Sequence, residues 1–155
     1  MNKINGKANL LTYEQLMDYK TLDEALGKNG ALVLLYETQE GYGHWCCVFK
    51  RGGLVEHFDS YGLKPDDELK YIPKYFREEK GITRPHLTSL LYKSPYKVSY
   101  NEHKLQSKKD DMNTCGRWVI ARLLLRDVPL TRFKNYFKRK PVSPDDIVTA
   151  FTEVV

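Results

Sequence analysis

The fold prediction depends on residues 44–59, which read HWCCVFKRGGLVEHFD. Two apolar runs rich in β-branched and aromatic residues, 44–49 and 54–59, flank the segment Lys50-Arg51-Gly52-Gly53. A Gly-Gly pair between two such runs is a usual signal for a β-hairpin. We therefore predict two adjacent antiparallel strands joined by this turn.

Further strands are predicted on both sides of the hairpin. The continuous apolar run 31–36 is typical of a strand buried on both faces. Gly41 and Gly43 separate it from the hairpin. Downstream, residues 87–92 are interpreted as another strand, and the weaker pattern of 96–105 as an edge strand or a loop.

Helical signals surround these strands. Thr12-Tyr13-Glu14-Gln15 and Thr21-Leu22-Asp23-Glu24 both match the capping-box pattern of a helix start. Further helices are predicted over 66–76 with a kink at Pro73, over 115–126, over 130–138, and over 144–154 with Ser143 as N-cap and Pro144 in the first position. The predicted fold class is α+β, with a small, central, mainly antiparallel sheet flanked by helices.

The bulk composition is that of a globular domain. Of the 155 residues, 41% are apolar and 29% are charged, so we predict a single domain over residues 1–155. No run approaches the roughly 20 apolar residues that a membrane-spanning helix needs. The first residues lack the apolar core of a signal peptide. We therefore expect an intracellular protein without a membrane partner.

The three cysteines do not form a disulfide framework. Their number is odd, and Cys46 and Cys47 are adjacent. No CxxC pair or HExxH element is present, so the sequence predicts no metal site. Cys115 stands apart from the other two cysteines.

Cys115 lies at the junction of a polar loop and an apolar helix, in Asn113-Thr114-Cys115-Gly116-Arg117-Trp118. The unpaired N–H groups and the macrodipole of a helix N-terminus favour an anion such as a thiolate. The same N–H groups can stabilise an oxyanion. Gly116 leaves room for a substrate backbone. The alternative is a buried structural cysteine, which is common among free cysteines.

His44 and Asp59 lie at the open end of the predicted hairpin. Because the first strand runs away from His44 and the second returns to Asp59, antiparallel pairing brings the two side chains together. A carboxylate bonded to one ring nitrogen leaves the other facing a thiol. The alternatives are an ordinary surface histidine and a turn-forming aspartate.

The order of these motifs resembles a known family. His-Trp at 44–45, Phe-Asp-Ser-Tyr-Gly at 58–62 and Asn-Thr-Cys-Gly at 113–116 resemble the adenovirus-type maturation protease and its relatives, the ubiquitin-like-protein-specific proteases. The resemblance covers roughly residues 31–125. Thr-Cys-Gly-Arg-Trp at 114–118 looks more like proteases of large DNA viruses, virophages and related elements.

This resemblance implies a papain-like cysteine peptidase fold with the circularly permuted order His, Asp, Cys, and the cysteine at the N-terminus of a buried helix. It implies Cys115 as nucleophile, His44 as base and Asp59 as the residue that orients the base. The family also uses a glutamine as an oxyanion donor, for which Gln106 is the candidate. Gln106 precedes Cys115 by nine residues, a longer interval than is usual in the family, and Asn113 is the alternative.

The resemblance also implies a biological role. It indicates a thiol endopeptidase that cleaves after glycine-containing sites in viral capsid or core precursors during virion maturation, with Trp45 and Gly116 contacting the substrate. We expect a monomer without a cofactor, located in the virion and at the assembly site in the host cell. The resemblance leaves open whether DNA or a peptide activates it.

The net charge is +5, and basic residues cluster at 97–109 and 132–140. The second cluster mixes cations with aromatic residues, as polyanion-binding surfaces do. Adenoviral relatives use DNA as a partner. The candidate nucleic-acid contacts are Lys108, Lys109, Arg132, Lys134, Lys138, Arg139 and Lys140. A solvated helix face is the alternative.

Three rival functions remain open at the level of sequence. One is a deubiquitinase or deSUMOylase that acts on host conjugates, and another is an acetyltransferase on the same scaffold. The third is a non-enzymatic nucleic-acid-binding or capsid-binding module, in which Cys115 belongs to the core.

Overall fold

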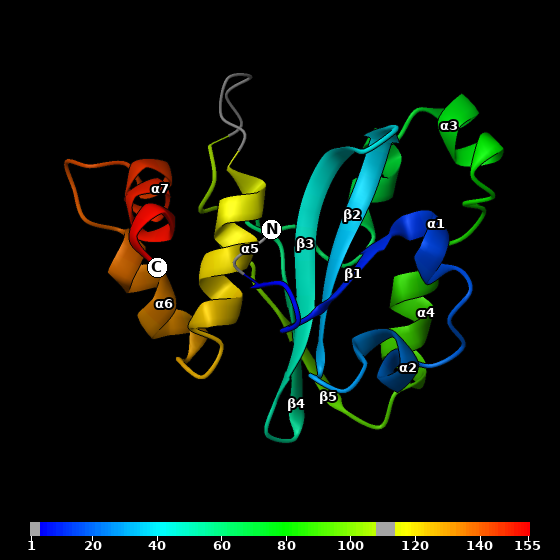
Figure 1. Cartoon of the computed structure of the whole chain (residues 1–155), viewed down its shortest axis with the longest axis horizontal. Helices are drawn as coiled ribbons and strands as arrows, with labels where there is room; N and C mark the ends of the chain where they lie inside the picture. The colour runs from blue at the N-terminus through cyan, green and yellow to red at the C-terminus, as the bar shows by residue number, and fades with distance from the viewer. Residues whose placement is uncertain (1–3, 108–113) are drawn as a thin grey trace.

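Strand β3 lies at the centre of a five-stranded sheet in the computed structural model, which describes residues 4–107 and 114–155 (Figure 1). The strands follow the order β1-β2-β3-β4-β5 and comprise Asn9–Thr12, Ala31–Gln39, Tyr42–Arg51, Leu54–Phe58 and Lys97–Tyr100. Strands β3 and β4 pair antiparallel on either side of Gly52 and Gly53, so the predicted hairpin is confirmed. Gly52 has a φ of +63°, a conformation that glycine adopts without strain.

The sheet is mixed, and the prediction of a mainly antiparallel sheet holds for its longer, central ladders but not for its two edges. The ladders β2–β3 and β3–β4 are antiparallel, whereas β1–β2 and β4–β5 are parallel. Both parallel pairs join strands separated by helices, which give the chain the length it needs to return in the same direction. No sequence pattern predicted β1, a strand of four residues, and only a weak pattern indicated β5.

The helices match the predicted positions closely at both ends of the chain. They are α1 Tyr13–Leu16, α2 Leu22–Leu26, the 3₁₀ helix η2 Asp67–Tyr71, α3 Lys74–Glu79, α4 His86–Lys93, α5 Cys115–Leu124, α6 Leu130–Phe137 and α7 Pro144–Val154. Thr12, Thr21 and Ser143 cap α1, α2 and α7 through their side chains, as the sequence predicted. Among the residues that the structure describes, no helix is both long and apolar enough to cross a membrane.

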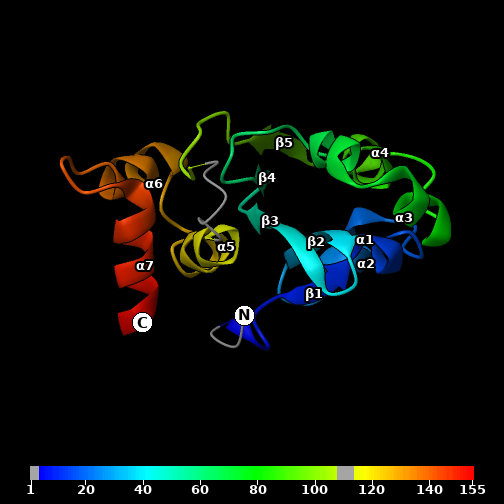
Figure 2. The same ribbon diagram turned by 90° about the horizontal axis from the view of Figure 1, so that it is seen from above.

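Helices cover both faces of the sheet. Figures 1 and 2 show α1 to α4 on one side and α5 to α7 on the other. Residues of β2 alternate between the two cores, because Leu32 and Leu34 pack with the first group of helices and Ala31 and Val33 with the second. The prediction of a strand buried on both faces is therefore confirmed.

Residues 87–92, which the sequence analysis assigned to a strand, lie in helix α4. Leu87, Leu90 and Leu91 have the i, i+3, i+4 spacing of one helix face, and all three are buried against the first core. A short apolar run is ambiguous between strand and helix, and here the packing of one apolar face decides for helix.

A buried ion pair fixes α5 to the hairpin. The guanidinium of Arg122 is fully buried and donates two hydrogen bonds to the carboxylate of Glu56 on β4, of 2.8 and 3.0 Å. It also lies over the rings of Phe49 and Phe133, 5.2 and 4.9 Å from their centroids. This bidentate geometry ties the helix that begins at Cys115 to the strand that leads to Asp59.

Removing one member of this pair should strongly destabilise the fold. We expect Glu56→Gln to lower the free energy of unfolding by about 3–5 kcal/mol, because it leaves the guanidinium of Arg122 buried without a counter-charge. Urea denaturation followed by circular dichroism measures the change. As a control, Glu78→Gln breaks the exposed pair with Lys74 and should cost less than about 1 kcal/mol. Equal effects of the two substitutions would contradict the role given to the buried pair.

Candidate active site

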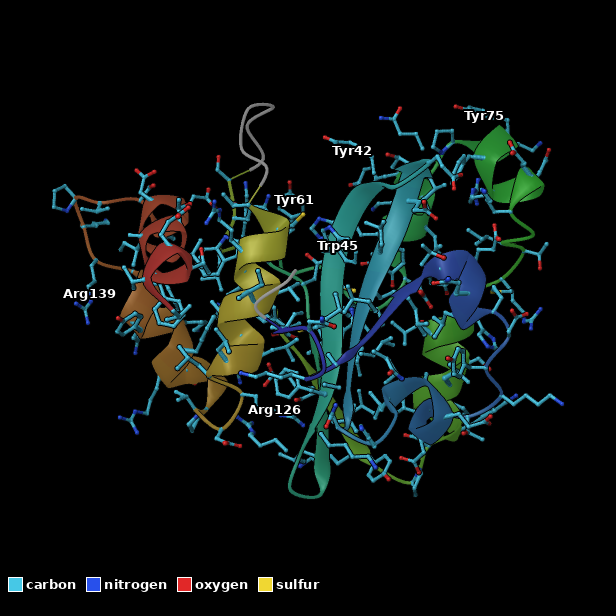
Figure 3. The ribbon with its side chains drawn as sticks, in the orientation of Figure 1. Tyr42, Trp45, Tyr61, Tyr75, Arg126 and Arg139 are labelled. Carbon is cyan, nitrogen blue, oxygen red and sulfur yellow. The ribbon has the colours of Figure 1, made fainter. Side chains whose placement is uncertain are left out.

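Three elements meet at one end of the sheet. They are the start of β3, the chain just after β4, and the N-terminus of α5. Tyr61 and Trp45 lie between β3 and this end of α5 (Figure 3). Gly43 precedes His44, and a side chain at position 43 would collide with the backbone carbonyl of Tyr36 on β2. A glycine is therefore required where the chain carries His44 into the site.

His44 and Asp59 form a buried hydrogen-bonded pair. The Nε2 atom of His44 lies 3.1 Å from Oδ2 of Asp59, and the two residues are 9% and 1% exposed. The other carboxylate oxygen of Asp59 accepts a hydrogen bond of 2.7 Å from the backbone N–H of Tyr61. The side-chain amide of Asn101 donates to the backbone carbonyl of Asp59. These two bonds hold Asp59 from the side opposite His44. Asp59 thus lies beside His44, as the hairpin predicted.

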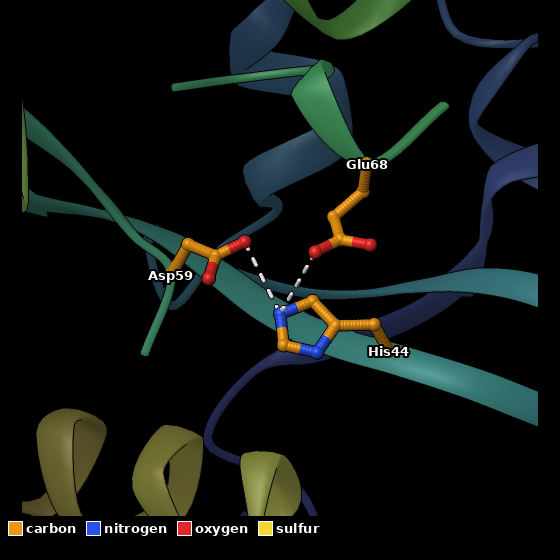
Figure 4. A group of neighbouring side chains, drawn as sticks. All are labelled: His44, Asp59 and Glu68. Carbon is orange, nitrogen blue, oxygen red and sulfur yellow. Dashed lines mark hydrogen bonds and ion pairs between the residues drawn. The ribbon is translucent and has the colours of Figure 1, made fainter. Parts of the chain in front are cut away.

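Cys115 is the first residue of α5, is 3% exposed, and forms a side-chain hydrogen bond with His44. Since Asp59 occupies Nε2, the edge of the ring that carries Nδ1 is the one turned toward α5 (Figure 4). The ring of Tyr61 stacks on the imidazole, with centroids 4.8 Å apart and planes inclined by 18°. The structure therefore brings Cys115, His44 and Asp59 together in one hydrogen-bonded series.

The surroundings of His44 favour its protonated form. Burial opposes the positive charge, but hydrogen bonds to Asp59 and Cys115, together with the negative charges of Asp59 and Glu68, outweigh it and raise the pKa of His44 to about 10. An imidazolium beside a cysteine favours the thiolate over the thiol. The arrangement is thus suited to a thiolate–imidazolium pair at neutral pH.

Glu68 is a second carboxylate at the same ring nitrogen, and the sequence analysis missed it. Its Oε1 lies 3.8 Å from Nε2 of His44, and the residue is 7% exposed (Figure 4). Glu68 comes from η2, which follows Asp66 in the left-handed conformation at a φ of +70°. Asp66 is held there by hydrogen bonds from the hydroxyls of Tyr13 and Tyr36. Because these partners come from distant elements, no local sequence signal could have identified Glu68.

Three donors in this cluster could hold a divalent cation. His44 Nε2 and one carboxylate oxygen each of Asp59 and Glu68 lie within 4.8 Å of one another. Nitrogen and oxygen donors of this kind suit an ion such as Zn²⁺. An ion bound to Nε2 would leave the ring proton on Nδ1, so a neutral, metal-bound His44 could not accept a proton from Cys115.

Gln106 is buried, and its side chain is oriented by Ser60. The hydroxyl of Ser60 donates a hydrogen bond of 2.5 Å to Oε1 of Gln106, and the backbone N–H of Gln106 donates to the carbonyl of Ser60. Three consecutive residues thus contact the site: Asp59 bonds to His44, Ser60 bonds to Gln106, and Tyr61 stacks on His44. Asn113, the alternative oxyanion donor, lies outside the described residues.

Trp45 and Gly116, the predicted substrate contacts, flank the same site. Trp45 is partly buried against the core that α5 forms with the sheet. Gly116 is the second residue of α5 and is partly exposed. Both therefore lie close along the chain to a residue of the hydrogen-bonded series, Trp45 after His44 and Gly116 after Cys115.

The other histidines and cysteines lie elsewhere. His57 is buried within β4, where burial lowers its pKa, and His86 bonds to the carbonyl of Tyr19. Cys46 and Cys47 are fully buried in β3, and burial raises the pKa of both thiols well above the ordinary range. His57, Cys46 and Cys47 are therefore inaccessible members of the core in which burial favours the uncharged form, and His86 is buried at the start of α4.

The basic candidates gather around α6. The exposed members are Arg132, Lys138, Arg139 and Lys140, of which Arg139 is labelled in Figure 3. The guanidinium of Arg139 lies 4.7 Å from the centroid of the Tyr136 ring. Lys134 contacts Nε2 of His103 at 2.7 Å, which joins the two basic stretches of the sequence. Lys108 and Lys109 lie outside the described residues.

The site combines a thiol, an imidazole and a carboxylate in one hydrogen-bonded series at the end of a mixed sheet. This is the arrangement that activates a cysteine for nucleophilic catalysis. The chain is 44% identical over 157 residues to the Sputnik virophage protein named Uncharacterized protein V9, and the match covers 98% of this chain and 90% of that protein. The chain therefore belongs to the family of this virophage protein.

No family model matches the sequence. Among solved structures, that of the ASFV pS273R protease is similar over 77% of this chain and 42% of that one, with 19% identity and a TM-score of 0.34. The chain thus spans less than half the length of that protease, and the TM-score is too low to establish a shared fold.

Removing the charge of Glu68 should lower the pKa of His44. In Glu68→Gln the imidazolium loses a nearby negative charge, so its proton should dissociate at lower pH than in the wild type. Asp59→Asn should lower the pKa further, because it also alters the direct hydrogen bond. Titration of the His44 ring followed by NMR measures both. Asp67→Asn, a neighbouring change on η2, is the control and should leave the titration unchanged; an unshifted His44 in Glu68→Gln would refute the effect.

Proposed function

We propose that this protein is a cysteine endopeptidase, with Cys115 as nucleophile, His44 as base and Asp59 as the residue that orients the base. The observation that carries the proposal is the buried series from Asp59 through His44 to Cys115, which ends at a helix N-terminus. The order His44, Asp59, Cys115 along the chain matches the circularly permuted, papain-like order of the protease family that the sequence resembles. Among residues 4–107 and 114–155, neither Cys46 nor Cys47 forms a hydrogen bond with a histidine, and both are buried in the sheet.

The chemistry follows from these positions. His44 accepts the thiol proton of Cys115 on the ring nitrogen opposite Asp59, and the thiolate attacks the carbonyl carbon of the scissile bond. The backbone N–H of Cys115 and the side-chain amide of Gln106 stabilise the resulting oxyanion. His44 passes its proton to the leaving amine as the carbon–nitrogen bond breaks. It then takes a proton from water while the water oxygen attacks the carbonyl carbon of the thioester. The carbon–sulfur bond breaks, the carboxylic acid product leaves, and the sulfur of Cys115 regains its proton from His44.

Asp59 and Glu68 act on this cycle through His44. Asp59 fixes the tautomer and the plane of the ring, because it holds Nε2 and leaves Nδ1 for the thiol. The charge of Glu68 further favours the imidazolium during the steps in which His44 carries the proton. Stacking by Tyr61 restricts rotation of the ring out of this plane.

The substrate class and setting rest on different support. The resemblance favours cleavage after glycine-containing sites, with Trp45 and Gly116 beside the scissile bond. The family relation to a Sputnik virophage protein supports a viral setting. We therefore propose that the substrates are capsid or core precursors, cut in the virion or at the assembly site, by a monomer that needs no metal or organic cofactor.

Incubation of the purified protein with co-encoded structural proteins tests the proposal. We expect new termini after glycine with the wild type, none with Cys115→Ala, and a residual rate with Asp59→Asn, because catalysis survives in part when the orienting carboxylate is lost. Mass spectrometry maps the termini. Iodoacetamide at neutral pH should label Cys115 far faster than Cys46 or Cys47. Undiminished cleavage by a folded Cys115→Ala variant would refute the assignment.

Two further assays separate the rival enzymes. A vinyl-sulfone probe made from ubiquitin or a ubiquitin-like protein should not label Cys115 if capsid precursors are the substrates. Rapid labelling by such a probe, with no cleavage of structural proteins, would favour a deconjugating enzyme. Transfer of an acetyl group to a protein acceptor without hydrolysis would favour the acetyltransferase.

We also propose that DNA binds at the basic residues around α6. The exposed cations beside Tyr136 form a surface that suits phosphate contact and base stacking. We expect affinity for DNA to fall steeply with salt, and the double substitution Arg132→Gln and Arg139→Gln to reduce the salt dependence by about two charges. Fluorescence anisotropy with labelled DNA measures both. Lys74→Gln on α3 is the control, and an absence of binding at low salt would rule the surface out.

A further inference from the structure

Asp145 of α7 makes three hydrogen bonds that leave its own helix. The residue is 3% exposed. One carboxylate oxygen, Oδ2, accepts from the backbone N–H of Ser107 at 2.8 Å. The other, Oδ1, accepts from the hydroxyl of Thr114 at 2.6 Å and from the indole N–H of Trp118 at 2.9 Å. A buried carboxylate with three donors is both satisfied and fixed in position.

The partners of Asp145 adjoin the two ends of the active-site segment. Ser107 directly follows Gln106, and Thr114 directly precedes Cys115. Because both are bonded to one carboxylate group, Gln106 and Cys115 are held near each other although they are nine positions apart in the sequence. The interval between Gln106 and Cys115 is longer than is usual in the protease family that the chain resembles. Asp145, a residue of another helix, bonds to residues at both ends of this interval.

Helix α7 also has a cap and contacts with α5 that do not involve Asp145. Ser143 caps the helix by accepting from the backbone N–H of Asp146. Val148 packs in the core, and Arg117 of α5 bonds to Thr152 and Glu153. These contacts would keep α7 in place without Asp145, so its carboxylate has a local effect on Ser107 and Thr114.

We infer that Asp145 is a positioning residue of the active site, which holds the oxyanion donor Gln106 in register with the nucleophile Cys115. The inference rests on the proposed peptidase function. Ser60 orients the amide of Gln106, and Asp145 fixes the backbone beside it. An oxyanion donor must lie about 2.7–3.1 Å from the oxyanion, and a displacement of about 1 Å can cost roughly 10²-fold in rate.

The substitution Asp145→Asn tests the inference at one atom. Its Oδ1 can still accept from Thr114 and Trp118, but an amide NH₂ replaces the oxygen that faces the N–H of Ser107. We expect kcat on a Gly-Gly peptide amide to fall about 10- to 100-fold with little change in KM. The rate of alkylation of Cys115 by iodoacetamide should change less than about twofold, because this reaction forms no oxyanion and depends on the thiolate alone.

Two further variants decide between a positioning and a merely structural role. In a Gln106→Ala background, Asp145→Asn should have almost no additional effect, since residues that act through one group are non-additive. Arg117→Met, which releases α7 at the other end of its contact with α5, is the matched control and should leave kcat within about twofold. If Asp145→Asn does not fold, Thr114→Val replaces it, and Thr114→Ser, which keeps the hydroxyl, should restore kcat.

The outcomes separate the inference from the proposed function. A wild type without peptidase activity on any glycine-containing amide refutes both. A wild type that cleaves, with an Asp145→Asn variant that cleaves equally well, refutes the role of Asp145 alone. Parallel losses of cleavage and of Cys115 alkylation would show general destabilisation and would also refute it.

Discussion

The buried ion pair between Arg122 and Glu56 joins the two parts of the molecule from which the site is assembled. Glu56 belongs to the hairpin that carries His44 and Asp59, and Arg122 to the helix that starts at Cys115. The pair lies two turns along α5 from Cys115, so it fixes the direction of the helix without occupying the site. The side chains of His44 and Cys115 are thus brought together with the help of two charges that lie away from the site in the interior of the protein.

Much of the fold could be predicted from short-range sequence patterns. The Gly52-Gly53 turn, the apolar run that begins at Ala31, and the Ser143-Pro144 helix start all depend on neighbouring residues, and the structure has each of them. Strand β1 and the parallel ladders could not be predicted, because a short edge strand pairs through its backbone with a strand about twenty residues away. The strand predicted over residues 87–92 was wrong for a related reason, because packing of one apolar face, not local propensity, makes this segment a helix.

The residues of the site also differ in whether short-range sequence patterns could predict them. His44, Asp59 and Cys115 could be placed together because one antiparallel hairpin and one helix start dictate where they lie. Glu68 and Asp145 could not, since each reaches the site through contacts with residues far away in the sequence. Their roles in catalysis remain predictions, as do those of the three residues that the sequence identified.

The double attachment of residues 107 and 114 to one carboxylate changes how the chain between them can evolve. When both ends of a segment are fixed by a third residue, the number of residues between them no longer sets the distance they must span. The entropy cost of closing such a loop grows only with the logarithm of its length, about 0.6 kcal/mol for each doubling. Residues can thus be gained or lost between these two anchor points at little thermodynamic cost, which makes this interval a natural place for related chains to differ in length.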